Sequence, residues 1–100
     1  MYLKIHSTGE RYGHRFVVAV CDKELIGKTI SDKKFNININ ESFYKGDIMD
    51  ENEVINILKD STNANLIGKK SIEAGLKAGI ISKENIIEIA GIPHAQAVSS

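Results

Sequence analysis

The chain has 100 residues, of which 42% are hydrophobic and 26% are charged, and its 13 basic residues balance its 13 acidic ones. A chain of this length and composition forms one globular domain with a core of its own. Proteins that hold nucleic acid mainly by neutralising phosphates are strongly basic. A net charge of zero therefore disfavours a general polyanion binder and is compatible only with a local basic patch.

The sequence favours the cytoplasm and predicts no contact with a membrane. A single cysteine excludes an internal disulfide, which is usual in a reducing compartment. The chain has no apolar run long enough to span a bilayer and no charged start followed by an apolar signal core.

The first forty residues have the alternation typical of strands. Tyr2–His6 predicts one strand, and the β-branched, almost continuously apolar Arg15–Cys21 predicts a central strand covered on both faces. The polar Ser7–Gly13 between them predicts a hairpin loop. Asp22–Lys28 predicts a turn or a short helical turn. Lys34–Asn40, in which apolar residues alternate with asparagines, predicts a strand with one solvated face.

Two helices are predicted to follow. Asp50, with a glutamate three residues later, matches an acidic version of the capping box, and one apolar face continues to about Ser61. The second helix is predicted to start at a cap on Asn63 or Asn65, to run to residue 77 or 78, and to end at Gly79. Two glycines inside it cost about 1 kcal/mol each relative to alanine, which indicates that another backbone approaches closely.

The end of the chain returns to strands and defines the fold class. Ile86–Ile89 predicts one strand and Ala95–Val98 another, joined by a connection that contains the only proline. The order of elements is roughly β-β-β-α-α-β-β. It predicts a single α+β domain over residues 1–100, with a mainly antiparallel sheet and two helices packed on one face.

Cys21 is the only candidate for a thiol nucleophile. A thiolate needs a base, and the spacing of the three histidines pairs none of them with this cysteine, which ends an apolar run as a small core residue does. The same residues form no recognised set of metal ligands. We therefore predict no catalytic residue, metal or cofactor. The alternative is a small enzyme that uses Cys21 or His94 with a nearby carboxylate such as Asp22 or Glu24.

Gly68–Ser71 resembles a phosphate-binding loop but lacks two required positions. That motif needs a glycine five residues before the Gly-Lys pair and a hydroxyl residue directly after the lysine, and no strand is predicted to lead into it here. What is left is a helix start with Asn65, Gly68, Lys69 and Lys70, which can either hold an anion or form a solvated basic turn.

Pro93–Gln96 is our first choice for a site. Proline restricts its own φ and favours an extended form of the residue before it, so the direction of His94 is constrained. On an extended segment His94 and Gln96 share one face, where they can bind an amide, a base edge or a phosphate, or bond neighbouring loops. The predicted binding surface joins these two side chains to Asn65, Gly68, Lys69 and Lys70.

The chain resembles a small, mainly archaeal family, domain of unknown function 424. The resemblance covers nearly the full length and rests on five segments: Met1–Lys4, Val20–Lys28, Phe43–Gly46, Ala64–Gly68 and Gly91–Gln96. It implies a compact cytoplasmic α+β domain of archaeal type with no established activity or catalytic residues. An association with translation is an expectation about such archaeal families that no motif of this chain carries.

Three hypotheses about function follow. The preferred one is a small cytoplasmic binding module without turnover, whose expected partner is RNA or the translation machinery. The second is the small enzyme described above. The third is a protein–protein adaptor or a homodimer built on an exposed sheet edge.

Overall fold

The computed structural model describes residues 1–8 and 15–98. Most of the predicted loop Ser7–Gly13 lies outside these ranges. Among the described residues no helix is both long and apolar enough to cross a membrane. The described elements are β1 (Tyr2–Thr8), β2 (Arg15–Cys21), η1 (Lys23–Leu25), β3 (Thr29–Ser31), β4 (Asn36–Asn38), α1 (Glu41–Tyr44), β5 (Asp47–Ile48), α2 (Glu51–Lys59), β6 (Ala64–Ile67), α3 (Lys69–Ala78), η2 (Lys83–Asn85), β7 (Ile86–Ile89) and β8 (Ile92–Ala97).

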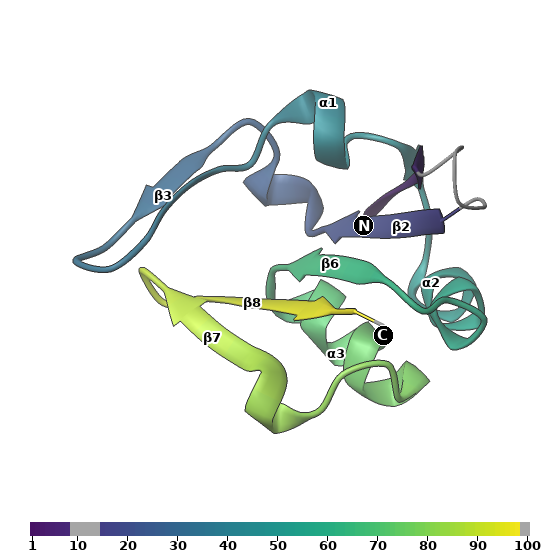
Figure 1. Ribbon diagram of the computed structural model, residues 1–100. Helices are drawn as coiled ribbons and strands as arrows, with labels where there is room; N and C mark the ends of the chain where they lie inside the picture. Colours follow the sequence, from purple (N-terminus) through teal and green to yellow (C-terminus); the bar gives the residue numbers. More distant parts are fainter. Residues whose placement is uncertain (9–14, 99–100) are drawn as a thin grey trace.

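Six of the strands form one sheet in the order β5-β1-β2-β6-β8-β7 (Figure 1). Every neighbouring pair is antiparallel except β2 and β6, which are parallel. Strands β3 and β4 form a separate two-stranded ribbon. The predicted α+β class, with a mainly antiparallel sheet and two main helices, is confirmed.

Helices α2 and α3 cover one face of the sheet (Figure 1). Val54 and Leu58 of α2 and Ile72 and Ala74 of α3 pack there against inward-facing residues of the strands, such as Val20. The capping box predicted at Asp50 is present, and Gly79 ends α3 in the left-handed conformation, with φ of 77°.

The opposite face of the sheet is only partly covered. Tyr44 of α1 and Ile30 and Ile39 of the ribbon region bury Cys21 and Ile67 there. The part of this face over the start of β2 and over β6, β8 and β7 is not covered by a helix. We call it the open face, and its exposed or half-exposed side chains are Val17, Asn65, Ile87, Gln96 and Val98.

The predicted start of the second helix is wrong. Ala64–Ile67 is a strand, β6, inserted between β2 and β8, and α3 begins only at Lys69. As a strand, this apolar segment pairs its backbone on both sides and buries Leu66 completely. The close approach to Gly75 inside α3 comes from the side chains of Leu66 and Ile81 rather than from another backbone.

The predicted strand Lys34–Asn40 is shorter in the structure. Only Asn36–Asn38 pairs, as the edge strand β4, and its asparagines are exposed as expected. Asn40 leaves the strand because its side chain caps α1, accepting a hydrogen bond from the Phe43 N–H at 2.8 Å.

Candidate functional site

His94 lies on β8 and its ring is largely buried. One hydrogen bond shows which of the two ring nitrogens carries the proton. The residue is 7% exposed, and Nδ1 lies 2.9 Å from the carbonyl oxygen of Leu66 on β6. Because a carbonyl oxygen only accepts, Nδ1 must donate. Burial lowers the pKa of His94, although the bond to Leu66 opposes this shift. The imidazole is therefore neutral near pH 7, and Nε2 is a hydrogen-bond acceptor.

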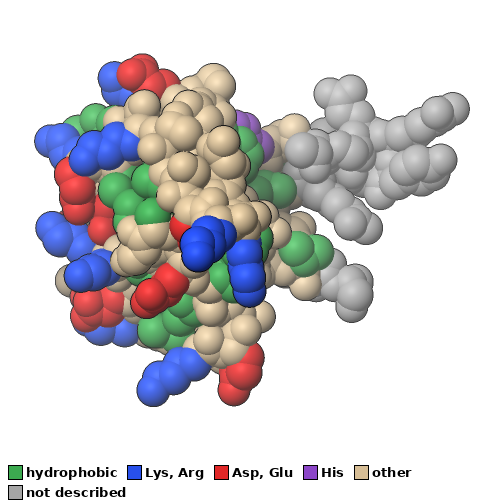
Figure 2. All heavy atoms as spheres, turned by 90° about the vertical axis from the view of Figure 1, so that its left-hand side faces the viewer, with side chains coloured by type: hydrophobic (Ala, Val, Ile, Leu, Met, Phe, Trp, Pro, Cys, Tyr) green, Lys and Arg blue, Asp and Glu red, His purple; other side chains and the backbone are tan. Residues whose placement is uncertain are grey.

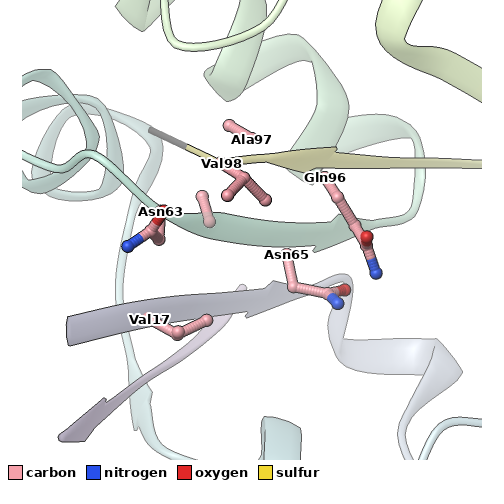
Figure 3. Close-up of a pocket in the computed structure, with 7 residues that line it drawn as sticks. Val17, Asn63, Asn65, Gln96, Ala97 and Val98 are labelled. Carbon is pink, nitrogen blue, oxygen red and sulfur yellow. The ribbon is translucent and has the colours of Figure 1, made fainter. Parts of the chain in front are cut away.

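Gln96 and Asn65 face each other across β8 and β6. They are partners in the register of these antiparallel strands, and Figure 3 shows their side-chain amides next to each other. Oδ1 of Asn65 accepts a hydrogen bond of 2.6 Å from the hydroxyl of Tyr44, whose pKa is raised by burial. This bond orients the Asn65 amide and leaves its Nδ2 group without a partner among the described residues.

Two hollows of the open face meet at Gln96. The first, which we call the amide hollow, has a volume of about 330 Å³ and is lined by Val17, Asn63, Asn65, Gln96 and Val98, among others (Figure 3). The second, the ribbon groove, has a volume of about 380 Å³ and lies between the β3–β4 ribbon and strands β7 and β8. Its lining includes Phe35, Ile37, Asn85, Ile87, His94 and Gln96.

The start of α3 does not present the free amide groups that the sequence suggested. The carboxylate of Asp22, which is 3% exposed, accepts hydrogen bonds from the backbone of Lys70 at 3.0 Å and from the N–H and hydroxyl of Ser71 at 2.8 Å each. This internal anion occupies the position that a bound phosphate would need. A strand, β6, does lead into this helix, contrary to expectation.

Three of the six predicted site residues therefore come together on the open face: Asn65, His94 and Gln96. Gly68 has a structural role, since its N–H donates a hydrogen bond to the carbonyl of Pro93 at 2.9 Å. Lys69 and Lys70 are exposed on α3, in the layer that covers the opposite face of the sheet.

Cys21 does not have the environment of a nucleophile. Its side chain is completely buried, its Sγ donates to the carbonyl of Asp22 at 3.1 Å, and its pKa is raised to about 12, first by burial and then by the charges of Asp22 and Glu24. Cys21 and His94 both pair with Ile67 from opposite sides, so they lie two strands, or about 10 Å, apart. Among the described residues, no three histidine, cysteine or acidic side chains gather as metal ligands.

The sequence did not indicate that Phe35 lines a groove or that Tyr44 orients the amide of Asn65. Two lysines directly before Phe35 were an available signal, because cations beside an aromatic ring are a feature of single-strand binders. Nothing local shows, however, that this segment folds over β7 and β8. Phe43 is an aromatic packing residue, since its ring stacks on His6 at a centroid distance of 4.6 Å.

Comparison with known proteins gives a family and a fold without an activity. No curated protein matches the chain. A crystal structure of an uncharacterized conserved protein from Methanopyrus kandleri is similar, with 25% identity and a TM-score of 0.81 over 99% of this chain and 93% of that one. The model of a protein family of unknown function, DUF424, matches residues 10–99. The chain therefore belongs to the DUF424 family.

Proposed function

We propose that the protein is a cytoplasmic, non-catalytic module that binds single-stranded RNA on the open face. The observation that carries this proposal is the pair of amides of Asn65 and Gln96, which lie side by side at the junction of the two hollows. The Asn65 amide is oriented by Tyr44, whereas Gln96 is exposed and has no partner among the described residues.

The two side-chain amides support RNA as the ligand, because unpaired bases present both hydrogen-bond donors and acceptors on their edges. A side-chain amide offers a carbonyl oxygen and two N–H donors, so it can satisfy either kind of group. Recognition of RNA by sequence mostly targets such unpaired bases in single strands. Two adjacent amides on an uncovered sheet face suit this purpose better than contact with a duplex backbone.

The charge of the molecule suits a ligand with few phosphate contacts. Lys33 and Lys34 are exposed and directly precede Phe35, which lines the ribbon groove. On the face shown in Figure 2, lysines and acidic side chains are interspersed, without a large area of either sign. We therefore expect about two phosphate contacts and a binding mode that depends mainly on the bases.

Binding without turnover is supported by the state of the candidate catalytic groups. The Cys21 thiol is buried with a pKa raised to about 12, so it supplies no thiolate near neutral pH. His94 uses Nδ1 in a structural hydrogen bond, and Cys21 lies two strands away from it.

Fluorescence anisotropy with a labelled pool of random single-stranded 12-nucleotide RNAs tests this proposal. With two phosphate contacts, log affinity falls with log salt at a slope of about −1.4, so that affinity drops about sevenfold between 50 and 200 mM salt. A Gln96→Glu variant places a negative charge on the open face with little change of shape, and we expect it to weaken binding at least about tenfold.

The matched control is the Lys69→Ala, Lys70→Ala double variant, which removes two exposed charges from the opposite layer. It should bind as the unchanged protein does. Absence of salt-dependent RNA binding contradicts the proposal, and so does a control that loses as much affinity as Gln96→Glu.

A further inference from the structure

The ribbon groove has walls of two different kinds. Phe35 and Ile37 come from the β3–β4 ribbon, whereas Ile87, His94 and Gln96 come from the sheet. Phe35 is 39% exposed, so part of its ring is available to a ligand. The volume of about 380 Å³ lies near the lower end of the range of about 300–1,000 Å³ for small-molecule pockets, which suits a single ring system with its sugar.

One carboxylate, that of Asp32, connects the tip of the ribbon to the turn between β7 and β8. Oδ1 of Asp32 accepts hydrogen bonds of 2.9 Å from the N–H groups of Lys34 and Phe35, and Oδ2 accepts one of 3.2 Å from the N–H of Ala90 in the β7–β8 turn. Figure 1 shows the ribbon reaching this turn. These bonds lower the pKa of Asp32. Asp32 thus positions Phe35 relative to β8.

The turn that meets Asp32 has an unusual backbone. Ala90 has φ of 52° and Gly91 has φ of 81°. Two successive positive φ values are those of a type I′ hairpin turn, in which asparagine or glycine is usual at the first position. Alanine there carries strain of roughly 1–2 kcal/mol, and its N–H is the group that Asp32 binds.

His94 provides an acceptor inside this groove. No buried side-chain nitrogen or oxygen among the described residues lacks a hydrogen-bond partner, and Nε2 of His94 makes no bond to any of them. Nε2 is therefore not fully enclosed, and the groove is the space that His94 lines. Since Nδ1 carries the proton of the neutral ring, Nε2 can only accept.

We infer that the ribbon groove holds one unstacked nucleobase, stacked on Phe35 and donating an N–H group to Nε2 of His94, with Gln96 bonding the same base edge. This inference rests on the proposed RNA binding and names the site of one base. Lys33 and Lys34, exposed beside Phe35, contact the phosphate of that nucleotide.

The polar groups of the groove favour a base over an apolar peptide side chain. An apolar occupant would cover Nε2 and the Gln96 amide without replacing their bonds to water, and such unsatisfied groups cost about 1–3 kcal/mol each. The lysines beside Phe35 also complement a phosphate, which an apolar peptide lacks.

Nitrogen-15 NMR of the full chain tests the base directly. Each of the four nucleoside 5′-monophosphates is added in turn, with ribose 5-phosphate as the control without a base. We expect at least one nucleotide to shift the Nε2 resonance of His94 and the signals of Phe35, and ribose 5-phosphate to shift neither. Equal shifts with ribose 5-phosphate, or no shift with any nucleotide, overturn the inference.

Variants of Phe35 separate stacking from general packing. Phe35→Leu removes the ring, and we expect it to weaken nucleotide binding about tenfold, because base–aromatic stacking is strong. Phe35→Trp keeps a stacking surface and should retain binding. The matched control is Phe16→Leu, since Phe16 is also an exposed phenylalanine. It precedes Val17 on β2, and neighbouring residues of a strand point to opposite faces, so Phe16 lies on the face away from the ribbon groove. A Phe35→Leu variant that binds as well as Phe16→Leu contradicts the inference.

The two proposals can fail separately. Suppose that the RNA pool binds and that Gln96→Glu abolishes this binding, but that no nucleotide shifts the NMR signals of Phe35 and His94. In that case the RNA module stands and the base site is wrong. If nucleotides shift His94 and Phe35 but no RNA binds, the site takes free nucleotides and the proposed RNA function is wrong.

Discussion

Gly68 and Pro93 face each other at the end of the β6–β8 pair with one hydrogen bond instead of two. The Gly68 N–H donates to the Pro93 carbonyl at 2.9 Å, whereas the Gly68 carbonyl accepts from the N–H of Ile72 in α3, also at 2.9 Å. Proline has no N–H to donate, so it is usually confined to edge strands. It is tolerated inside this sheet because its partner carbonyl already serves the helix.

Gly68 should be far less tolerant of alanine than Gly79 is. A Cβ on Gly68 would overlap the side chain of Asp22, and φ there is 108°. Strain and overpacking together should lower the free energy of unfolding by about 3–4 kcal/mol. Gly79→Ala has φ of 77° but open space, so about 1–2 kcal/mol is expected. Urea unfolding of both variants measures the difference, and equal losses contradict this account.

Asp22 should be a major contributor to stability. Asp22→Ala leaves the N–H groups of Lys70 and Ser71 and the hydroxyl of Ser71 without their acceptor. We expect the free energy of unfolding to fall by about 3 kcal/mol. Asp60→Ala removes an exposed carboxylate at the end of α2 and should change it by less than about 0.5 kcal/mol. Thermal and urea unfolding measure the free energy of unfolding of both variants. Similar losses in Asp22→Ala and Asp60→Ala would contradict the role given to Asp22.

Cys21 should be inert in the native protein. Burial and a pKa of about 12 keep the thiol protonated and inaccessible. Ellman's reagent at pH 8 should react with the folded protein roughly a hundredfold more slowly than with the protein unfolded in urea, because reaction requires opening of the sheet. Prompt reaction of the folded protein would show that the thiol is accessible and would revive the thiol-enzyme hypothesis.

His94 should make the protein less stable in mild acid. Its pKa is lowered from 6.5 by burial, so below pH 6.5 the unfolded chain binds a proton that the native ring still excludes. The free energy of unfolding should therefore fall as pH drops from about 6.5 towards the native pKa. His94→Gln should show a smaller fall between pH 7 and 5.5 in urea titrations. An identical fall in both proteins would mean that other groups cause it.

Features that depend on neighbours in the chain could be predicted from the sequence. The capping box at Asp50 and the stop at Gly79 are set within one helical turn, and the apolar pattern of Arg15–Cys21 is enough to indicate a central strand. That His94 and Gln96 lie on the same face of the sheet follows from the alternation of side chains along a strand.

Features that depend on distant partners could not be predicted. Three of the four residues of Ala64–Ile67 are apolar and continue into the period of α3, and only pairing with β2 and β8 makes this segment a strand. Asp22 binds the start of α3 from 48 and 49 residues away, so the helix start looked free. The position of Phe35 depends on how the whole ribbon folds over β7.

The most direct test of the central claim is the RNA anisotropy titration of the unchanged protein, Gln96→Glu and the Lys69→Ala, Lys70→Ala control. The open face predicts salt-dependent binding that Gln96→Glu weakens at least about tenfold and the control leaves unchanged. Absence of RNA binding, or its loss in the control rather than in Gln96→Glu, would contradict the assignment of the open face.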